Sequence, residues 1–500
     1  MESVVLQGLL SSLAPTSIIA VLVGVFVGIA VGIVPGIGAG VGLSLLLPII
    51  FNVPPLIGLM LLLALWASDG YGASISSILL NVPGGAGAVA TCFDGHPMAQ
   101  QGKAGEAIGI SMASSMLAGI LGTFVLMLAA PPLAKLAVKI GPAEYTIMAI
   151  LGMTLIGGMA GKNRIKGLVS AIIGLMVSFI GYDLTTGFVR YNFGSAYLFD
   201  GIEFELVLIG FFAIGELMQA GEEGGTVAEF GKMTGTVMGG FKEALKRPMS
   251  ILRSSLVGVV MGVLPGIGIT ISSMAAYEVE KKFSKTPEKF GTGMVEGIIG
   301  PEAANNSCQP AALIPTLTLG IPAGSTSAVF LGALIMYGLT PGMDLFTNKA
   351  PLVWAMMWGI IVASIAYVLV GLIFANWFAK LTILPIEYLV PCTLVTCFIG
   401  AFVTTNSFYD LVVAFLFGLI GYVMAVLKYP PAPAILGVVL GPILEKNYFR
   451  ALLLSDGSHR IFFNGTLAIC LWCILALILF APLLFKLFKN RKEAKLLRNL

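Results

Sequence analysis

The sequence is poor in charge and in histidine. Asp, Glu, Lys and Arg make up 11% of its 500 residues, about half the share of an ordinary soluble domain, while 57% are hydrophobic. Such a chain cannot cover a water-soluble core with polar side chains. With two distant histidines, His96 and His459, a histidine metal centre or a Ser-His catalytic site has little to draw on. The six cysteines are scattered, mostly within apolar runs, which is typical of small buried residues.

What the sequence has instead is long apolar runs. Examples begin at Ala143, Val353 and Thr466, and they approach or exceed the ~20 residues that a helix needs to cross a bilayer. These runs are apolar on every face, which favours helices over strands that would alternate polar and apolar residues. The predicted fold is an all-α polytopic membrane protein with about 12 transmembrane helices plus re-entrant hairpins.

Three pairs of motifs recur in the same order and indicate an internal duplication. "VGIAVGIVPGIG" ends at Gly38 and "VGVVMGVLPGIG" ends at Gly268. "LNVPGG" begins at Leu80 and "LGIPAG" at Leu319, and the last pair is "PAEY" at Pro142 and "PIEY" at Pro385. Each copy is therefore a membrane unit of about two hundred residues, in line with the usual size of one domain.

Charge in the loops predicts that the two copies are inverted. The loop "GKNRIKG" after the first "PAEY" run is basic, whereas its counterpart "TTNSFYD" has no base. After the "PGIG" motifs the bias reverses, since "FNVPP" is uncharged and "KKFSKTPEK" is basic. The predicted organisation is a first transmembrane repeat over 15–220, a cytoplasmic connecting segment over 221–253, a second repeat over 254–450, an additional helix over 464–485 and a basic cytoplasmic tail over 486–500.

Glycine and proline breaks within these repeats are the predicted substrate site. In transporters with inverted repeats, helix starts at such breaks bind anionic groups and unwound carbonyls bind cations near the membrane midplane. The competing interpretations are that the glycines only allow close helix packing, and that Ser and Thr bond back to their own helices. The candidate substrate-binding residues are Pro35, Gly36, Gly38, Ser74, Ser76, Asn81, Pro83, Gly84, Gly85, Pro265, Gly266, Gly268, Asn305, Asn306, Thr316, Pro322, Gly324, Ser325 and Thr326.

Asp69 is the candidate cation ligand. It is one of three acids in the first 102 residues, and an acid within a membrane span is a functional candidate by default. The alternative is a residue at a loop edge that reaches water. The break motifs contain no Lys or Arg, so we expect a cotransported cation to help neutralise an acidic substrate.

The "PGIG" segments, with the stretches that begin "YGASISSILLNVPGG" at Tyr71 and "ANNSCQPAALIPTLTLGIPAG" at Ala304, resemble the large membrane subunit (TctA) of the tripartite tricarboxylate transporter family. The resemblance runs over residues 15 to 450. It implies a multi-pass permease of the bacterial inner membrane that works with a TctB-like small membrane subunit and a TctC-like periplasmic solute-binding protein. Import driven by an ion gradient, commonly sodium, is implied as well.

The predicted function is therefore symport of citrate-like tricarboxylates or related organic acids with a cation. An elevator-type movement is preferred because the hairpins would travel as compact pairs, and rocking is the alternative. Dicarboxylates or aromatic acids would fit the same polar breaks. An anion channel would need a continuous pore lined by charge, and a membrane-embedded enzyme would need a nucleophile with a base or a metal cluster. No GxxxxGK[ST] phosphate-binding pattern occurs. We expect no enzyme activity, no cofactor beyond the coupling ion and no nucleic-acid partner.

Overall fold

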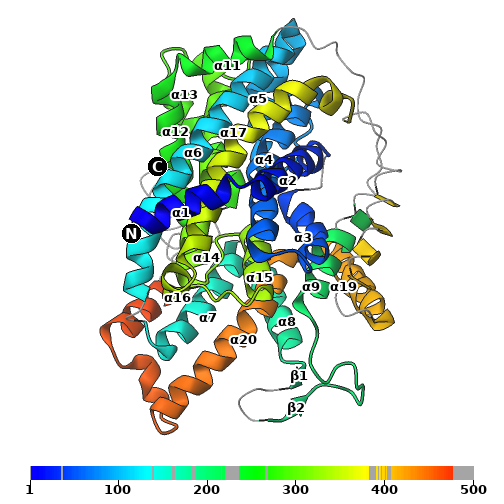
Figure 1. Cartoon of the computed structure of the whole chain (residues 1–500), viewed down its shortest axis with the longest axis vertical. Coiled ribbons are helices and arrows are strands. Elements are labelled where there is room, and N and C mark those ends of the chain that lie inside the picture. The colour runs from blue at the N-terminus through cyan, green and yellow to red at the C-terminus, as the bar shows by residue number, and fades with distance from the viewer. Residues whose placement is uncertain are drawn as a thin grey trace, which may run out of the picture. The chain divides into compact units, whose positions relative to one another are not determined.

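The computed structural model describes residues 2–34, 38–137, 140–159, 164–182, 187–215, 217–219, 236–264, 268–381, 390–391, 394–395, 397–399, 401–402 and 407–476. The chain divides into two compact units, and each is described by itself. The first unit consists of Met1–Ala137 with Glu203–Pro431, and the second of Val138–Ile202 with Ala432–Leu500. In the described residues both units are built of helices, and a single pair of two-residue strands occurs in the second (Figure 1).

The described helices of the first unit come from both predicted repeats. Helix α1 (Glu2–Ser12) precedes the predicted first repeat, from which come α2 (Pro15–Ile33), α3 (Ala39–Ile50), α4 (Pro55–Leu80), η1 (Ala86–Ala88), α5 (Thr91–Met98), η2 (Ala99–Lys103), α6 (Ala104–Ala137), α9 (Phe204–Leu208) and η3 (Ile209–Ile214). After them come α11 (Val237–Leu245), α12 (Pro248–Val263), α13 (Gly268–Phe283), η4 (Pro287–Lys289), α14 (Val295–Leu319), α15 (Ser325–Met336), α16 (Met343–Thr347), α17 (Ala350–Leu381) and α19 (Phe408–Val426).

Glycine stripes hold the long helices of this unit together. Gly24, Gly28 and Gly32 on α2 lie against the backbone of α4, where an added Cβ atom would meet backbone carbonyl oxygens. Gly258 and Gly262 on α12 lie in the same way against α14. These glycines let two backbones approach closely, which is how apolar helices associate in a membrane. Proline at the first position of α2, α4 and α12 costs no helix hydrogen bond, because that N–H has no partner within the helix.

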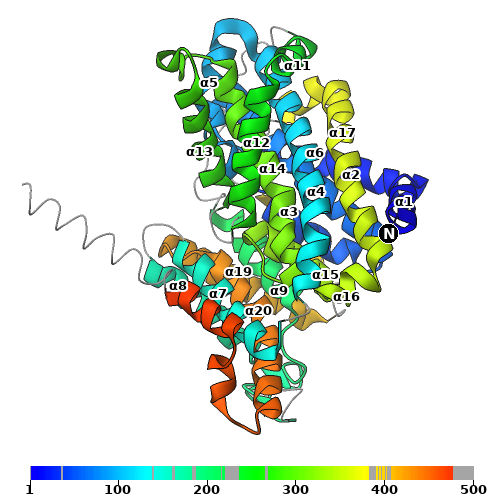
Figure 2. The same cartoon turned by 90° about the vertical axis from the view of Figure 1, so that its left-hand side faces the viewer.

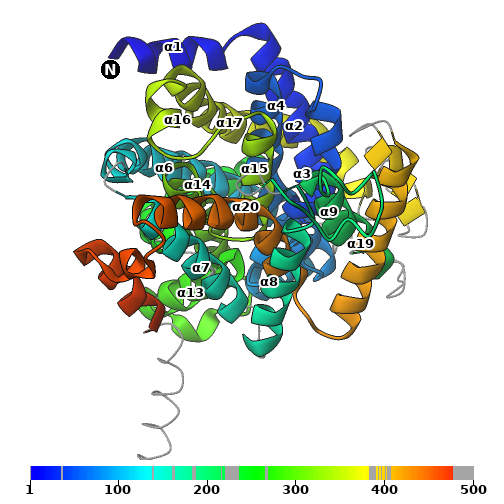
Figure 3. The same ribbon diagram turned by 90° about the horizontal axis from the view of Figure 1, so that it is seen from below.

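Helix α14 forms the polar centre of the first unit. It is buried from Gly297 to Thr318, although this stretch carries a glutamate, two asparagines and a glutamine. Figure 2 shows α12 and α13 running beside it, and it also contacts α4, α5 and α6. At the edge of the unit, α1 lies along α17 (Figure 3).

The two halves of the first unit present helices in matching order. A pair of helices that meet at a "PGIG" motif, α2–α3 or α12–α13, precedes a long helix, α4 or α14. Both long helices end on a residue in the left-handed conformation, Asn81 at φ 59° and Gly320 at φ 68°. This order supports the predicted repeat. The inversion and the predicted domain bounds stay predictions.

Among the described residues, five helices are long and apolar enough to cross a membrane. They are α2, α4, a span within the helical run Thr91–Lys135, Ala350–Phe374 of α17, and α19. The total of about 12 spans therefore stays a prediction. The arms of a re-entrant hairpin are too short to cross the membrane. Helices α12 and α13, with 16 residues each, are short enough for such arms, whereas α2, with 19 residues, is long enough to cross.

The second unit contains α7 (Pro142–Met159), α8 (Arg164–Ser178), the strands β1 (Gly181–Tyr182) and β2 (Val189–Arg190), α20 (Pro431–Leu454) and η5 (His459–Phe463). The two strands pair antiparallel, and Arg190 binds both carboxylate oxygens of Glu445 at 2.6 and 3.0 Å. The predicted additional helix over 464–485 is described as a helix from Thr466 to Ala476. Its remainder, the basic tail and the part of the connecting segment before residue 236 lie outside the described residues.

Candidate functional site

A cavity of about 450 Å³ lies inside the first unit, where both break motifs meet. Its wall includes residues 38–41 and 83–87 from the predicted first repeat. From the predicted second repeat come residues 268–270 and 323–327. The helices α4 and α14 supply the floor between these breaks, with Asp69 and Asn305. Segments that are some 230 residues apart in the sequence thus surround one space, of a size typical of small-ligand sites.

Three helices begin at this cavity. Gly38 is the N-cap of α3, α13 starts at Gly268, and Gly324 is the N-cap of α15. The first N–H groups of a helix have no partner within the helix and carry partial positive charge. Lys, Arg and His are missing from the cavity lining within the described residues. Positive potential in the described wall therefore comes from backbone N–H groups, which is an arrangement suited to carboxylate groups.

The cavity glycines differ from the packing glycines of the helix stripes. A Cβ atom added to Gly38, Gly268 or Gly324 would meet no atom within 4 Å. Gly268 also has φ +73°, a conformation that favours glycine. By contrast, a Cβ atom on Gly84 would lie 2.6 Å from the Ser76 hydroxyl. The first three positions therefore face open space, which supports the cavity-lining interpretation for them, while Gly84 serves close packing.

Buried oxygen atoms without a hydrogen-bond partner lie on two residues of the cavity floor and on Asn306, the neighbour of one of them on α14. The Asp69 side chain is 5% exposed, and its Oδ1 atom has no hydrogen-bond partner. The Oδ1 atoms of Asn305 and Asn306 are also buried and unpaired. A Cβ atom on Gly70, the next residue after Asp69, would lie 2.8 Å from Nδ2 of Asn305 and from Oδ1 of Asn306, so both side chains lie near this turn of α4. Buried polar atoms are normally hydrogen-bonded, so the three unpaired oxygens of these neighbouring residues favour binding of a cation or a donor.

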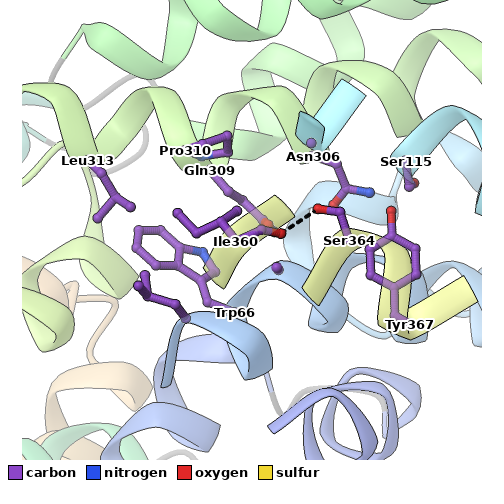
Figure 4. Close-up of a pocket in the computed structure, with 12 residues that line it drawn as sticks. Trp66, Ser115, Asn306, Gln309, Pro310, Leu313, Ile360, Ser364 and Tyr367 are labelled. Atoms are coloured by element: carbon purple, nitrogen blue, oxygen red, sulfur yellow. Dashed lines mark hydrogen bonds between the residues drawn. The ribbon is translucent and has the colours of Figure 1, made fainter. Parts of the chain in front are cut away.

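A smaller pocket of about 10 Å³ adjoins these residues (Figure 4). Trp66 and Gln309 line both spaces. Asn306 lies in the wall of the small pocket, with Ser115 and Tyr367. The side-chain amide of Asn306 and the Tyr367 hydroxyl are unpaired in the described structure.

The buried carboxylate of Glu302 lies on α14, one turn before the two asparagines. It accepts hydrogen bonds from four hydroxyl groups: Ser74 of α4 at 2.6 Å, Thr91 of α5, and Ser111 and Ser115 of α6 at 2.8 and 3.0 Å. Sequence reasoning did not select Glu302. The signal was available, because an acid inside a membrane helix is a functional candidate by default.

Other predicted site residues lie outside the cavity wall. Ser74 bonds to Glu302, Ser76 to the carbonyl of Ala73, and Thr316 to the carbonyl of Ala312. Asn81 is exposed at the end of α4 and Pro322 is buried beside the second break. Those that line the cavity are Gly38, Asp69, Pro83, Gly84, Gly85, Gly268, Asn305, Gly324, Ser325 and Thr326. Pro35, Gly36, Pro265 and Gly266 lie outside the described residues.

Comparison with known proteins gives one family. A model of the tripartite tricarboxylate transporter TctA family matches residues 18–436. A protein from Agrobacterium vitis, described as an uncharacterized 52.8 kDa protein in the TAR-I ttuC' 3' region, is 34% identical over 432 residues, 86% of each chain. Another from the same organism, described as an uncharacterized protein in the TAR-II ttuC' 3' region, is 37% identical over 211 residues, which are 42% of this chain and 87% of that protein. No solved structure matches.

Proposed function

Because the chain belongs to the tripartite tricarboxylate transporter TctA family, and is thus a tricarboxylate transporter component, we propose that it is the permease subunit that imports citrate-like tricarboxylates or related organic acids by sodium symport. The predicted family is confirmed by the match over residues 18–436, and the apolar helices agree with a multi-pass membrane protein. The bacterial inner membrane is the proposed location. The proposed partners are a TctB-like small membrane subunit and a TctC-like periplasmic binding protein.

The observation that carries this proposal is the meeting of three helix starts at one cavity without a basic side chain in its described lining. Each start, after Gly38, at Gly268 and after Gly324, has first-turn N–H groups without a partner within the helix that can donate to a carboxylate, while the N–H of Gly324 itself donates to Ser327 Oγ. Ser325 and Thr326 add hydroxyl donors beside the third start. A substrate with several carboxylate groups would use these donors together, whereas an uncharged substrate would leave them unpaired.

Sodium is the proposed coupling ion because of the unpaired oxygens beside Asp69. Hard cations prefer carboxylate and carbonyl oxygens. Asp69, Asn305 and Asn306 supply one carboxylate and two amide oxygens to this region, with the Asn306 oxygen near Gly70 and the Asn305 oxygen near Gly87. A cation held there would compensate the Asp69 charge and turn the floor of the cavity from repulsive to neutral for an anionic acid.

The test is uptake of labelled citrate by liposomes that contain the full chain with its proposed membrane partner, with the binding protein added outside. We expect uptake to require an inward sodium gradient and to fall at least tenfold in Gly324→Leu. Leucine there fills the cavity without meeting an atom within 4 Å of its Cβ atom. Ala196→Leu, at an exposed residue of the second unit, is the control for adding the same side chain elsewhere.

Uptake of citrate without a sodium gradient would remove the coupling ion from the proposal. Normal uptake by Gly324→Leu would show that the substrate passes somewhere other than this cavity. If citrate does not enter at all, uptake of dicarboxylates and aromatic acids in the same liposomes decides whether another organic acid is the substrate.

A further inference from the structure

Glu302 is an ionisable group to which the proposed symport of acid and sodium gives no role. Its carboxylate is buried completely on α14, within one helix turn of Asn305 and Asn306. Four neutral hydroxyl groups surround it, two on each carboxylate oxygen. They solvate the anion but cannot cancel its charge. None of the ion pairs of the described residues includes Glu302.

An isolated buried carboxylate is costly, and proteins usually pair such a group or neutralise it. The hydroxyl oxygens lie at hydrogen-bond distances from the carboxylate, with Ser74 at 2.6 Å and Ser115 at 3.0 Å. In this shell all four hydroxyl groups donate to the carboxylate oxygens. A proton fits the shell without moving these oxygens apart, since a protonated carboxyl group donates to a hydroxyl oxygen that had donated to it.

Within the described contacts, no basic group of the surrounding helices forms an ion pair with Glu302. Tyr71 of α4, Cys92 of α5 and Tyr367 of α17 face Glu302, and all three are ordinarily neutral near pH 7. The other titratable or charged groups of the helices packed against this part of α14 are Asp69, Asp94, His96, Glu106, Lys135, Lys242, Glu243, Arg253, Tyr277, Glu278, Glu280, Lys281 and Lys282. Among them, Arg253 pairs with Glu280, and Asp94 accepts from Tyr277 and from backbone N–H groups.

A polar route connects Glu302 with the substrate cavity. Ser115, which donates to its Oε2 atom, also lines the small pocket beside the cavity, and in Figure 4 the Tyr367 hydroxyl points toward Ser115. The pocket volume of about 10 Å³ is close to the minimum for one water molecule. Asn306 and Tyr367 offer such a water unpaired hydrogen-bonding atoms, and Gln309 borders both the pocket and the cavity.

We propose that Glu302 is a proton-binding site of the transport cycle, reached from the substrate cavity through the small pocket and Ser115. A proton from the aqueous solution is relayed through the water in the pocket, which stays neutral, binds at Oε2 while the acid occupies the cavity, and returns to the solution after the acid has left. This step rests on the proposed import of an organic acid. With sodium at Asp69 and a proton at Glu302, neither carboxylate beside the cavity repels the anionic substrate.

The first test needs no transport. Infrared difference spectra of the purified full chain, between alkaline and acidic buffer, detect protonated carboxyl groups in an apolar environment. We expect a protonated-carboxyl band that is present in the wild-type protein and missing in Glu302→Gln, whose amide keeps one acceptor oxygen for the hydroxyl shell. Identical spectra of the two proteins would overturn the proposal. Asp69→Asn is the matched control, and it should keep the Glu302 band.

The second test measures protons carried with the substrate. Liposomes with a trapped pH-sensitive dye report proton entry during uptake of labelled citrate at saturating sodium. Glu302→Gln should carry one proton fewer per citrate than the wild type, and its uptake should lose the corresponding pH dependence. Citrate's own titration is common to both proteins and cancels in the comparison. An unchanged proton-to-citrate ratio would overturn the proposal, whereas absence of citrate uptake in the wild type would count against the proposed function only.

A second variant covers the case in which Glu302→Gln does not fold. Ser115→Ala removes one of the two donors to Oε2 and the link to the small pocket. The anion loses a hydrogen bond, so the infrared band should persist to higher pH than in the wild type. An unshifted band in Ser115→Ala would contradict the proposed route. Thr123→Ala, a hydroxyl of the same helix that bonds only to the carbonyl of Gly119 in the described contacts, is the control.

Discussion

The replacement Asp69→Asn tests the proposed sodium site most directly, because it removes one charge and keeps the shape of the side chain. Two unit charges about 4 Å apart attract each other by about 4 kcal/mol at the effective dielectric constant near a protein surface. Each 1.4 kcal/mol corresponds to a tenfold change in affinity, so the full effect would approach a thousandfold. Water in the 450 Å³ cavity screens part of this attraction. We therefore expect the sodium concentration at half-maximal uptake to rise ten- to a hundredfold.

The assay is initial uptake of labelled citrate as a function of sodium concentration. At saturating sodium, the citrate KM of Asp69→Asn should stay within a few fold of the wild type, because the helix starts that receive the carboxylates are unchanged. Asp344→Asn, at an exposed acid in the first turn of α16, is the matched control and should change neither constant. An unaltered sodium dependence of Asp69→Asn would refute the assignment of the ion to this carboxylate, whatever happens to the maximal rate.

Three further replacements test the structural reasoning. Gly258→Val should lower the melting temperature or abolish folding, because its Cβ atom would meet the Ala304 carbonyl of α14. Such overpacking typically costs about 1–3 kcal/mol. An unchanged melting curve would contradict the close packing of α12 against α14. Asp94→Asn should destabilise the chain by about 1–3 kcal/mol, because its amide N–H₂ group would face the backbone N–H of Gly291, which now donates to both carboxylate oxygens. Full stability of Asp94→Glu in thermal unfolding would argue against this geometry. Lys246 and Arg247 lower the pKa of the Glu243 carboxyl to about 2, so its contribution to stability is present above the ordinary pKa of 4.5 and lost as pH falls toward 2. Glu243→Gln should lower the free energy of unfolding by less than about 1 kcal/mol at neutral pH, and the two proteins should be equally stable in strong acid.

The sequence indicates where the chain breaks, because this depends on local rules. Proline and glycine interrupt helices, and motifs repeated in the same order indicate equivalent positions of the predicted repeat. Gly38 and Gly268 are such a pair, and both line the cavity. The rules do not say which face of a helix each hydroxyl occupies. Ser76 and Thr316 belong to the predicted motifs, yet their hydroxyl groups bond to carbonyls of their own helices.

Glu302 could not be assigned from local rules, because its surroundings come from distant parts of the chain. Ser74 precedes it by 228 residues and Thr91 by 211. The motif around Asn305 indicates amides and hydroxyls as substrate ligands. Glu302, three residues earlier, has no basic neighbour in the sequence that would indicate an ion pair. Only the folded structure shows that four hydroxyl groups donate to the Glu302 carboxylate. These contacts show that it is a buried acid within a helix and not an acid that reaches water at a loop.

The same contacts limit how the proposed transporter can move. Glu302 joins α14 of the predicted second repeat to α4, α5 and α6 of the predicted first repeat by hydrogen bonds. Asp94 of α5 binds the loop that precedes α14 through the N–H groups of Gly293 and Met294. Rocking of one repeat against the other would break these buried hydrogen bonds, at about 1–3 kcal/mol for each polar group left unpaired. Movement of these helices as one body keeps them intact. The cavity, Asp69 and Glu302 would then travel together, which favours an elevator-type movement and requires that acid, sodium and proton share the same displacement.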